Sequence, residues 1–548
     1  MLIDARTLPE DTVIEQDICI IGAGAAGITL AREFIDRSEQ VCLLESGGMD
    51  FDEATQSLYG DKNIGNSYYP LKETRARYLG GSTNLWGGWS RPLDEIDFED
   101  RPWMPNSGWS IARDELVPYY QRAQQVCNLG PFEYELDYWQ DRFKQRQYQP
   151  LPTTAKDITT CLWQIIPPTH LRFGQVFKTE LERAKNIDTY LYANVVDIET
   201  NDTAQSVTRL RVATLEGKKF WIAAKAFVLA TGGIENPRLL LAANKVQNTG
   251  LGNQYDRVGR YFMEHPYIIS GRVRLFEPLP LYTQKNFQLG EMFMGVGLGL
   301  TKEVQKREQL LNFGARLLPL QEEWVESFNR LRGRQKKGHK AFPTIHEGRK
   351  YGREEVSVLE DALKVMTNLD RIALKAYEKL SKSKITALTY DTHLIAEQAP
   401  NPDSRVTLSS ERDRLGLNRA KLDWRLTPLD KHTIKRSQEI ITGEIERLGL
   451  GKATLELTDE SSWQHLTGSY HHMGTTRMDN NPRHGVVNEN CRVHGVSNLY
   501  VAGSSVFPTS GLSNPTLTII ALSIRLADYL KTSGIEDRRG YVESTISA

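Results

Sequence analysis

A glycine-rich turn between a β-branched run and a helical pattern is the feature that most constrains how this chain can fold. Residues 17–35 read DICIIGAGAAGITLAREFI, in which a short apolar run ends in G-x-G-x-x-G, formed by Gly22, Gly24 and Gly27, and a helical pattern follows. A second apolar run closes on Glu45, eighteen residues beyond Gly27. The pattern predicts a βαβ unit with the glycines at its first turn.

The residue types in this motif fit the physical needs of a dinucleotide site. Gly22 permits the tight turn, Gly24 lets backbone N–H groups approach a pyrophosphate, and Gly27 lets the helix pack on the strand. Ala26 lies in the same turn and is included in the predicted site. Glu45 can accept a hydrogen bond from a ribose 2′-hydroxyl, and the helix N-terminus adds positive potential. A carboxylate here argues against a 2′-phosphate, but it does not choose between NAD and FAD.

Strand, glycine turn and helix recur in the middle and at the end of the chain. KAFVLATGG (225–233) precedes PRLLLAAN, and NLYVAGSSVFP (498–508) precedes an apolar helical pattern at 516–530. If all three strands share one parallel sheet, the nucleotide-binding domain is discontinuous. We expect this domain to comprise residues 1–90, 160–265 and 480–548, and a second domain to comprise residues 266–479 with part of 91–159.

Length and composition set the broad class. The 548 residues exceed what one hydrophobic core normally serves, so two domains or a large insertion are expected. The net charge of −1 provides no field for nucleic acid or anionic lipid. No apolar stretch reaches the ~18 residues of a membrane span, and the N-terminus resembles no signal peptide. With five scattered cysteines as well, we expect a cytoplasmic protein without a membrane span.

Three further segments resemble, in order and spacing, the glucose-methanol-choline (GMC) oxidoreductases. They are LGGSTNLWGGWSRPL (79–93), ATGG (230–233) and GVVNENCRVHGVSNLYVAGSSVFPTSGLSNPTLT (485–518). The resemblance implies FAD as cofactor and an α/β fold. In it a discontinuous, three-layer Rossmann-like FAD-binding domain carries an inserted α+β substrate domain, whose antiparallel or mixed sheet covers the flavin.

The same resemblance implies positions for the cofactor along the chain. Gly81 and Ser82 are expected to approach the flavin and the pyrophosphate, and Val195 to border the adenine. Further cofactor contacts are expected near the C-terminus, beside the ribityl chain and at the start of the last helix, from Gly503, Ser504, Asn514 and Thr516.

At one position the chain departs from the common family pattern. Many members carry Asn in a GGSSxxNG sequence, whereas this chain has Trp86, which looks more like the pyranose oxidase branch. In that branch a histidine directly before this Trp attaches the flavin covalently. Here that position is Leu85, which has no nucleophile. The resemblance therefore implies non-covalent FAD, with Trp86 among its contacts.

The segment SYHHMGTTRM (469–478) carries the candidate base. Flavin-dependent alcohol oxidation needs a group near neutral pKa that takes the hydroxyl proton, and histidine suits this task. Aligned with the family on Gly474 and Thr475, the base is His471 and its partner is Asn514. Neighbours in an extended segment point to opposite faces, so His472 is expected to face away, although an alignment error of one residue would exchange the two histidines.

Asn514 has a structural alternative, because it directly precedes Pro515. Asn as N-cap followed by Pro at the first helical position is an ordinary helix start. The two roles are compatible. A helix that begins there would direct its positive end at the flavin.

The preferred substrate is a secondary alcohol on a sugar or glycoside, by resemblance to the pyranose oxidase and glycoside dehydrogenase branch. A strand within 392–406 is expected over the flavin, with His393, Glu397 and Gln398 as candidate hydroxyl contacts; a polar face of an exposed strand is the alternative. His472 is a further candidate substrate contact. The alternatives are another alcohol, such as a secondary metabolite or sterol, and a non-redox member resembling hydroxynitrile lyases. The electron acceptor (O₂, a quinone or a protein) and the oligomeric state stay open.

A group of histidines and a basic segment also bear on function. The histidines between residues 465 and 494 have no spacing that places two metal ligands on one helical face, so no metal site is predicted. Residues 329–353 are strongly basic and form either a mobile, solvated loop or a docking patch for an acidic partner or electron acceptor.

Overall fold

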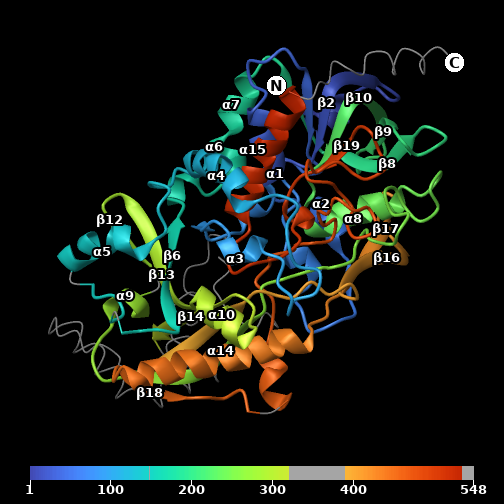
Figure 1. The fold of residues 1–548 in the computed structure, drawn as a ribbon. Helices are drawn as coiled ribbons and strands as arrows, with labels where there is room; N and C mark the ends of the chain where they lie inside the picture. Colours follow the sequence, from blue (N-terminus) through green and yellow to red (C-terminus); the bar gives the residue numbers. More distant parts are fainter. Residues whose placement is uncertain (147, 153, 285, 320–388, 459, 533–548) are drawn as a thin grey trace, which may run out of the picture.

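The computed structural model describes residues 1–532 apart from 147, 153, 285, 320–388 and 459. Two large sheets dominate these residues, one in the upper and one in the lower half of Figure 1. The basic segment 329–353 lies outside the described residues, so its predicted role stays a prediction.

The first sheet is mainly parallel and contains the glycine motif. Its central strand has four consecutive buried residues at its C-terminal end, which is typical of a strand covered on both faces. Only two of its strand pairs are antiparallel: β10 (Lys219–Leu229) with β9 (Val207–Ala213), and β9 with β8 (Asn194–Thr200). In order across the sheet the strands are β1 (Leu2–Asp4), β7 (Ile187–Leu191), β3 (Val41–Leu44), β2 (Val13–Ile21), β10 (Lys219–Leu229), β9 (Val207–Ala213) and β8 (Asn194–Thr200), with β19 (Leu499–Val501) also paired to β10.

The predicted βαβ unit and the shared parallel sheet are both confirmed. Strands β2 and β3 pair in parallel, and helix α1 (Ala25–Arg32) lies between them in the chain. Strand β10 pairs in parallel with both β2 and β19, so segments more than 450 residues apart join in one sheet. The last helix, α15 (Thr516–Thr532), packs against α1 and α4 (Arg113–Val126) on one side of this sheet.

The second sheet is antiparallel and belongs mostly to the middle of the chain. The long helix α14 (Pro428–Arg447) packs on it, at the bottom of Figure 1. Across the sheet the strands are β18 (Gly451–Thr454), β11 (Tyr267–Leu275), β15 (Thr389–Ala396), β14 (Phe313–Pro319), β13 (Met292–Leu300), β6 (Ile158–Ile165) and β5 (Trp89–Ser90), with β12 (Phe287–Leu289) paired to β13.

Shorter elements connect these layers. A third sheet joins β16 (Arg405–Arg412), β17 (Asn418–Asp423) and β4 (Lys62–Asn63). The remaining helices are α2 (Glu53–Gln56), α3 (Glu95–Phe98), α5 (Leu136–Gln145), α6 (Phe173–Val176), α7 (Lys178–Arg183), α8 (Gly232–Ala242), α9 (Pro280–Thr283) and α10 (Lys302–Glu308).

The strands differ from the sequence-based expectations in two places. Strand β6 pairs with β13 in the second sheet, although the predicted limits assign residues from 160 onward to the nucleotide domain. The strand expected within 392–406 ends at Ala396, because the chain leaves the sheet there and pairs again only from Arg405, in the third sheet. The domain limits themselves stay a prediction.

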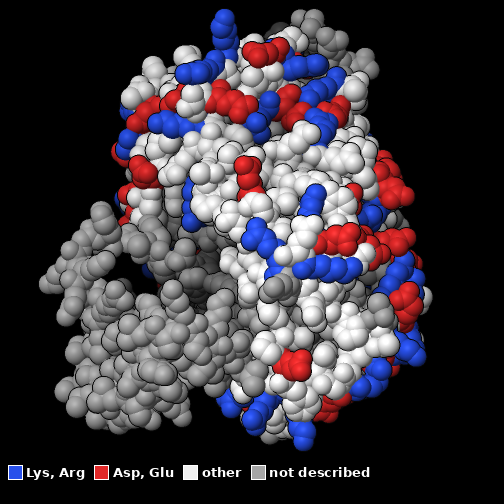
Figure 2. Space-filling model, turned by 90° about the vertical axis from the view of Figure 1, so that its left-hand side faces the viewer, with Lys and Arg blue, Asp and Glu red and all other residues white. Residues whose placement is uncertain are grey.

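Charged side chains of both signs are interspersed over the described part of the face in Figure 2. Within the described residues, none of the helices is both long enough and apolar enough to cross a membrane. The same residues include no group of three or more His, Cys, Asp or Glu that could hold a metal ion.

Candidate active site

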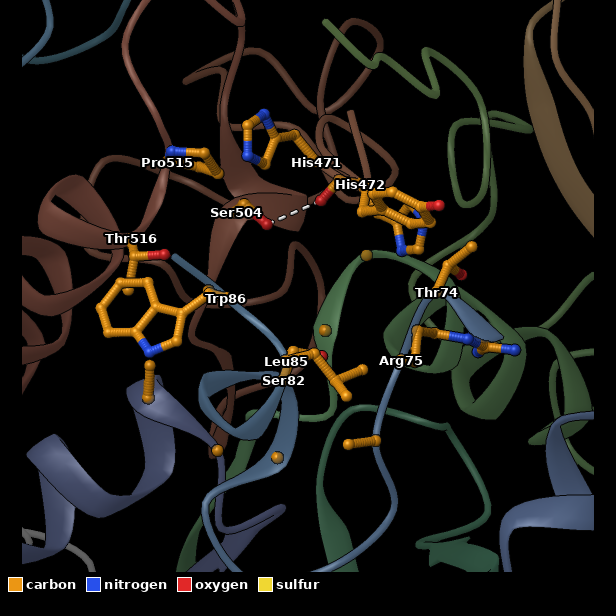
Figure 3. Close-up of a pocket in the computed structure, with 18 of the residues that line it drawn as sticks. Thr74, Arg75, Ser82, Leu85, Trp86, His471, His472, Ser504, Pro515 and Thr516 are labelled. Carbon is orange, nitrogen blue, oxygen red and sulfur yellow. Dashed lines mark hydrogen bonds between the residues drawn. The ribbon is translucent and has the colours of Figure 1, made fainter. Parts of the chain in front are cut away.

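A cavity of about 550 Å³ lies between the two large sheets and brings together segments from the whole chain. We call the part around Gly22, Gly24 and Glu45 the glycine end, and the part around His471, His472 and Asn514 the histidine end. Most of the predicted site residues line this one cavity (Figure 3): Gly22, Gly24, Ala26, Glu45, Gly81, Ser82, Trp86, Val195, His393, His471, His472, Gly503, Ser504, Asn514 and Thr516.

Close backbone packing at the glycine end explains its glycines. Gly22 has φ +104°, and a Cβ there would lie 2.7 Å from the Ala230 carbonyl oxygen. Gly27 does not line the cavity; a Cβ on it would lie 1.8 Å from the Gly22 carbonyl oxygen, as its predicted packing role requires. A Cβ on Gly81 would lie 2.9 Å from Gly24 Cα. The two loops therefore meet backbone to backbone, at a distance that leaves no room for side chains.

Glu45 closes the glycine end at the tip of β3. Its Oε1 accepts from the Gly47 N–H at 2.9 Å, and its Oε2 accepts from the Ala23 N–H at 3.1 Å. Burial raises the pKa of Glu45, while these two N–H groups and the nearby Arg77 act in the opposite direction. The carboxylate is thus fixed against the glycine turn with acceptor capacity left for a hydroxyl.

Donors at this end fit an anionic, polyhydroxylated ligand such as FAD. Arg77 lines the cavity, and its buried Nε and Nη1 have no hydrogen-bond partner among the described residues. The N-cap of helix α1 is Gly24, which has no side chain to accept a hydrogen bond, so the first N–H groups of the helix are left for a ligand in the cavity.

A buried ion-pair network stiffens the wall beside Arg77. Arg75 donates to Glu235 at 2.9 Å, and Arg238 donates to the other oxygen of Glu235 at 3.0 Å. Burial alone would raise the pKa of Glu235, but the guanidinium groups of Arg238, Arg75 and Arg77 lower it to about 2. Arg238 also donates to Asp413 at 2.6 Å. Glu235, Arg75 and Arg238 therefore keep their charges through mutual pairing.

At the histidine end of the cavity, both ring nitrogens of His471 lie close to a nitrogen of another side chain. Its Nδ1 is 2.7 Å from His265 Nδ1, and its Nε2 is 3.3 Å from Asn514 Nδ2. Burial lowers the pKa of His471 well below its ordinary value, and the His265 ring acts in the same direction. His471 is consequently neutral at neutral pH, as a proton acceptor must be.

His472 has different neighbours, although it lines the same cavity. Its Nε2 is 3.0 Å from the Tyr68 hydroxyl and 3.9 Å from Glu264 Oε1, and burial lowers its pKa to about 3. In Figure 3 the two imidazoles point in different directions, with Pro515 on the side of His471 and Thr74 on the side of His472. Both histidines line the cavity, but their rings point in different directions and have different partners. Which of the two rings faces the flavin stays a prediction.

Glu264 fixes the backbone that carries both histidines. Its carboxyl oxygens accept from the N–H groups of Ser469 and His471, at 3.0 and 2.9 Å, and from that of His265 at 3.0 Å. Tyr68 contacts the same carboxyl group. Burial raises the pKa of Glu264 to about 7 against the effect of these hydrogen bonds.

The structure does not bring Gln398 or Glu397 to the cavity. Gln398 is fully buried; its Oε1 accepts from Trp424 Nε1 and from the Glu264 N–H, each at 2.9 Å. Glu397 is fully buried in an ion pair with Arg101. A substrate hydroxyl cannot reach either side chain, because the chain leaves the sheet at Ala396 and turns inward. His393 does line the cavity, on β15.

Sequence reasoning missed His265, which contacts His471 although 206 positions separate them. Met263 and Met473 form an antiparallel bridge with reciprocal backbone hydrogen bonds of 3.0 Å. In that register residue 265 lies opposite residue 471. A two-residue bridge between loops leaves no periodic signal in a sequence, so only the folded chain reveals the pair.

Comparison with known proteins shows similarity to oxidoreductases. Residues 400–523 match the model of the GMC oxidoreductase family. The fructose dehydrogenase large subunit of Gluconobacter japonicus is 24% identical, over 94% of this chain and 97% of that protein. A C-glycoside 3-oxidase of Arthrobacter globiformis is 36% identical over 21% of each chain. The crystal structure of pyridoxine 4-oxidase from Mesorbium loti has a TM-score of 0.55, with 16% identity, over 94% of this chain and 99% of that one.

The family match and the curated relatives show the class: an FAD-dependent oxidoreductase that acts on CH–OH groups. The resemblance to the GMC oxidoreductases is confirmed, as is the α/β architecture that it implied.

Proposed function

We propose that this protein oxidises a secondary alcohol on a sugar or glycoside, with His471 as the base. The observation that carries the proposal is the neutral imidazole of His471, held between His265 and Asn514 in the same cavity as the glycine motif. FAD bound at the glycine end supplies the hydride acceptor. The names of two relatives, a fructose dehydrogenase subunit and a C-glycoside 3-oxidase, support the sugar class.

The chain's own residues divide the remaining work. His471 Nε2 takes the proton of the substrate hydroxyl, and Asn514 Nδ2, 3.3 Å away, donates to the same hydroxyl oxygen and orients it. His472 and His393 line the cavity as candidate contacts for other hydroxyl groups. Trp86 is held by a 2.7 Å hydrogen bond from its Nε1 to the Leu171 carbonyl oxygen and forms part of the cavity wall.

We also propose that the FAD is not covalently attached at the family's usual position. Leu85 lines the cavity there and offers no nucleophile. Precipitation of the protein with acid should therefore release the yellow cofactor into the supernatant. A pellet that stays yellow would contradict this assignment.

A non-sugar alcohol is the second candidate substrate. A 2-methyl-1,2-propanediol dehydrogenase of Mycolicibacterium austroafricanum is 24% identical over 96% of this chain. Overall similarity therefore does not distinguish a sugar substrate from a simpler alcohol. Trp89, Trp163 and Tyr267 line the cavity and would also suit a more apolar substrate.

The test is anaerobic mixing of the purified protein with a panel of sugars, glycosides and simple alcohols, while the visible flavin band is followed. The proposal predicts bleaching by one or more sugars or glycosides. Bleaching only by non-sugar alcohols would favour the second candidate. If no alcohol bleaches the flavin and the protein instead cleaves a cyanohydrin, the function is non-redox and resembles that of the hydroxynitrile lyases.

A further inference from the structure

The ring of His265 is the only titratable side chain within hydrogen-bond distance of His471 Nδ1 among the described residues. Its other nitrogen, Nε2, is 2.8 Å from the Gly511 carbonyl oxygen and 3.3 Å from that of Ser510. Carbonyl oxygens only accept hydrogen bonds, so Nε2 of His265 must carry a proton. His265 is fully buried, and burial lowers its pKa to about 4, so it is neutral at neutral pH and has no second proton.

That proton assignment determines the next one. Because His265 Nδ1 has a lone pair and no proton, the 2.7 Å contact with His471 Nδ1 is a hydrogen bond only if His471 donates. His471 is itself neutral, so a proton on Nδ1 leaves Nε2 as its lone-pair nitrogen. This nitrogen is the one beside Asn514 Nδ2, which can donate to it.

The carbonyl group that begins this chain of hydrogen bonds is itself firmly held. Gly511 has φ +57°, and a Cβ on it would lie 2.5 Å from Asp97 Oδ2, so the turn accepts no side chain. The Gly511 N–H donates to Glu397 Oε1 at 3.3 Å, and the buried Arg101 pairs with both oxygens of Glu397. The backbone oxygen that accepts from His265 therefore cannot easily rotate away.

We propose that His265 is a positioning residue that holds the single proton of His471 on Nδ1, through its own Nε2–H bond to Gly511, and so makes Nε2 the proton acceptor. The inference rests on the proposed role of His471 for its catalytic meaning, but the tautomer itself is independent of that role. No proton passes to His265. When His471 Nε2 takes a proton from a substrate hydroxyl, its Nδ1–H continues to donate to His265.

Two variants separate the acceptor function of His265 from its packing. His265→Asn places an amide oxygen near the position of Nδ1, so it keeps an acceptor for His471 but loses the contact with Gly511. His265→Gln can keep a donor near the Nε2 position for Gly511 but has no acceptor at the position of Nδ1. Both replacements are polar and smaller than the imidazole or similar to it, so each serves as the control for the other.

The readout is the ¹⁵N spectrum of the FAD-loaded protein labelled at its histidine ring nitrogens, with the His471 signals assigned by their loss in His471→Gln. We expect a protonated Nδ1 and an unprotonated Nε2 for His471 in the natural chain and in His265→Asn. In His265→Gln the proton should move partly or wholly to Nε2, and the anaerobic rate of flavin reduction should fall about tenfold, the worth of one hydrogen bond. Thermal unfolding midpoints and bound FAD show whether both variants are folded.

Two results would overturn the proposal: a proton on Nε2 of His471 in the natural chain, or a His471 that keeps Nδ1–H in His265→Gln. If a His265 variant does not fold, the first result still decides, because it needs only the spectrum of the natural chain and the assignment of the His471 signals. If the tautomer shifts as expected while His471→Ala reduces its flavin at the natural rate, His265 does hold the proton, and the proposed base is wrong. The two failures are therefore distinguishable.

Discussion

Beside the glycine end of the cavity, Glu235 remains charged because Arg75 and Arg238 pair with it. At the histidine end, titratable groups are buried with neutral partners, and the pKa of each histidine is lowered. Permanent donors suit a cofactor that carries a diphosphate. A ring that starts without a proton suits a group that must accept one. One cavity thus contains two electrostatic environments, and each can be altered separately.

Replacing His471 by Ala removes the acceptor at the histidine end and should have the largest effect. We expect the anaerobic rate of flavin reduction to fall by about 10²–10⁴, the usual worth of a positioned base, with bound FAD unchanged. His472→Ala is the matched control, since it removes the neighbouring ring, and should lose less than about tenfold. If His471→Ala reduces its flavin at the natural rate, His471 is not the proton acceptor.

The protonation of Glu264, the buried carboxyl group at the histidine end, can be tested through the pH dependence of stability. Its pKa is about 7 in the folded protein and 4.5 as the ordinary value, so between these pH values the folded state keeps a proton that the unfolded chain has lost. Its contribution to the free energy of unfolding therefore decreases as pH rises from 4.5 to 7, by about 3 kcal/mol in total, and is constant above 7.

The neighbouring histidines act with the opposite sign, because their lowered pKa values cost stability as pH falls below 6.5. The measurement is therefore the difference between the natural chain and Glu264→Gln in urea unfolding at several pH values. The difference should change by about 3 kcal/mol across the window. A constant difference would show that Glu264 is not protonated more readily when folded.

Glu45→Gln tests the glycine end alone. It keeps the shape of the side chain but removes the charge that we expect to accept from the cofactor, so FAD should bind about tenfold to a hundredfold more weakly, or about 1.5–3 kcal/mol. Titration of the apoprotein with FAD measures this loss. At saturating FAD, the rate of flavin reduction should match that of the natural chain. A lower rate at saturation would mean that the two ends are not separable.

Asn514→Ala should give the smallest effect, a loss of about two- to tenfold in the rate of flavin reduction, since one neutral hydrogen bond is removed. Asn514→Ser keeps a side chain that can cap helix α15, and so separates orientation of the substrate from helix capping. Equal losses in both variants point to orientation. Full activity in the Ser variant would reduce Asn514 to a helix cap.

The sequence predicts the structure of the glycine end more completely than that of the histidine end. Gly22, Gly24, Gly27 and Glu45 lie within one βαβ unit, so local spacing predicts both the strand pairing and the approach of a dinucleotide. Such units repeat a fixed geometry from protein to protein. For this reason the shared sheet of β2, β10 and β19 could also be predicted.

The histidine end depends on contacts between loops, which leave no period in the sequence. His265 reaches His471 through the Met263–Met473 bridge, and Glu264 reaches the same backbone from a position next to His265. Tyr470 has φ +65°, so the doublet does not continue a regular strand, and period-2 alternation alone could not assign the partners of His472. Gln398 was misplaced because its strand ends at Ala396.

Addition of imidazole to His471→Ala tests the central claim most directly, because it returns a base to the cavity without the rest of the side chain. The rate of anaerobic flavin reduction should rise in proportion to the concentration of uncharged imidazole, while the natural chain and His472→Ala show no gain. Recovery in His472→Ala, with none in His471→Ala, would contradict the account and assign the proton acceptor to His472.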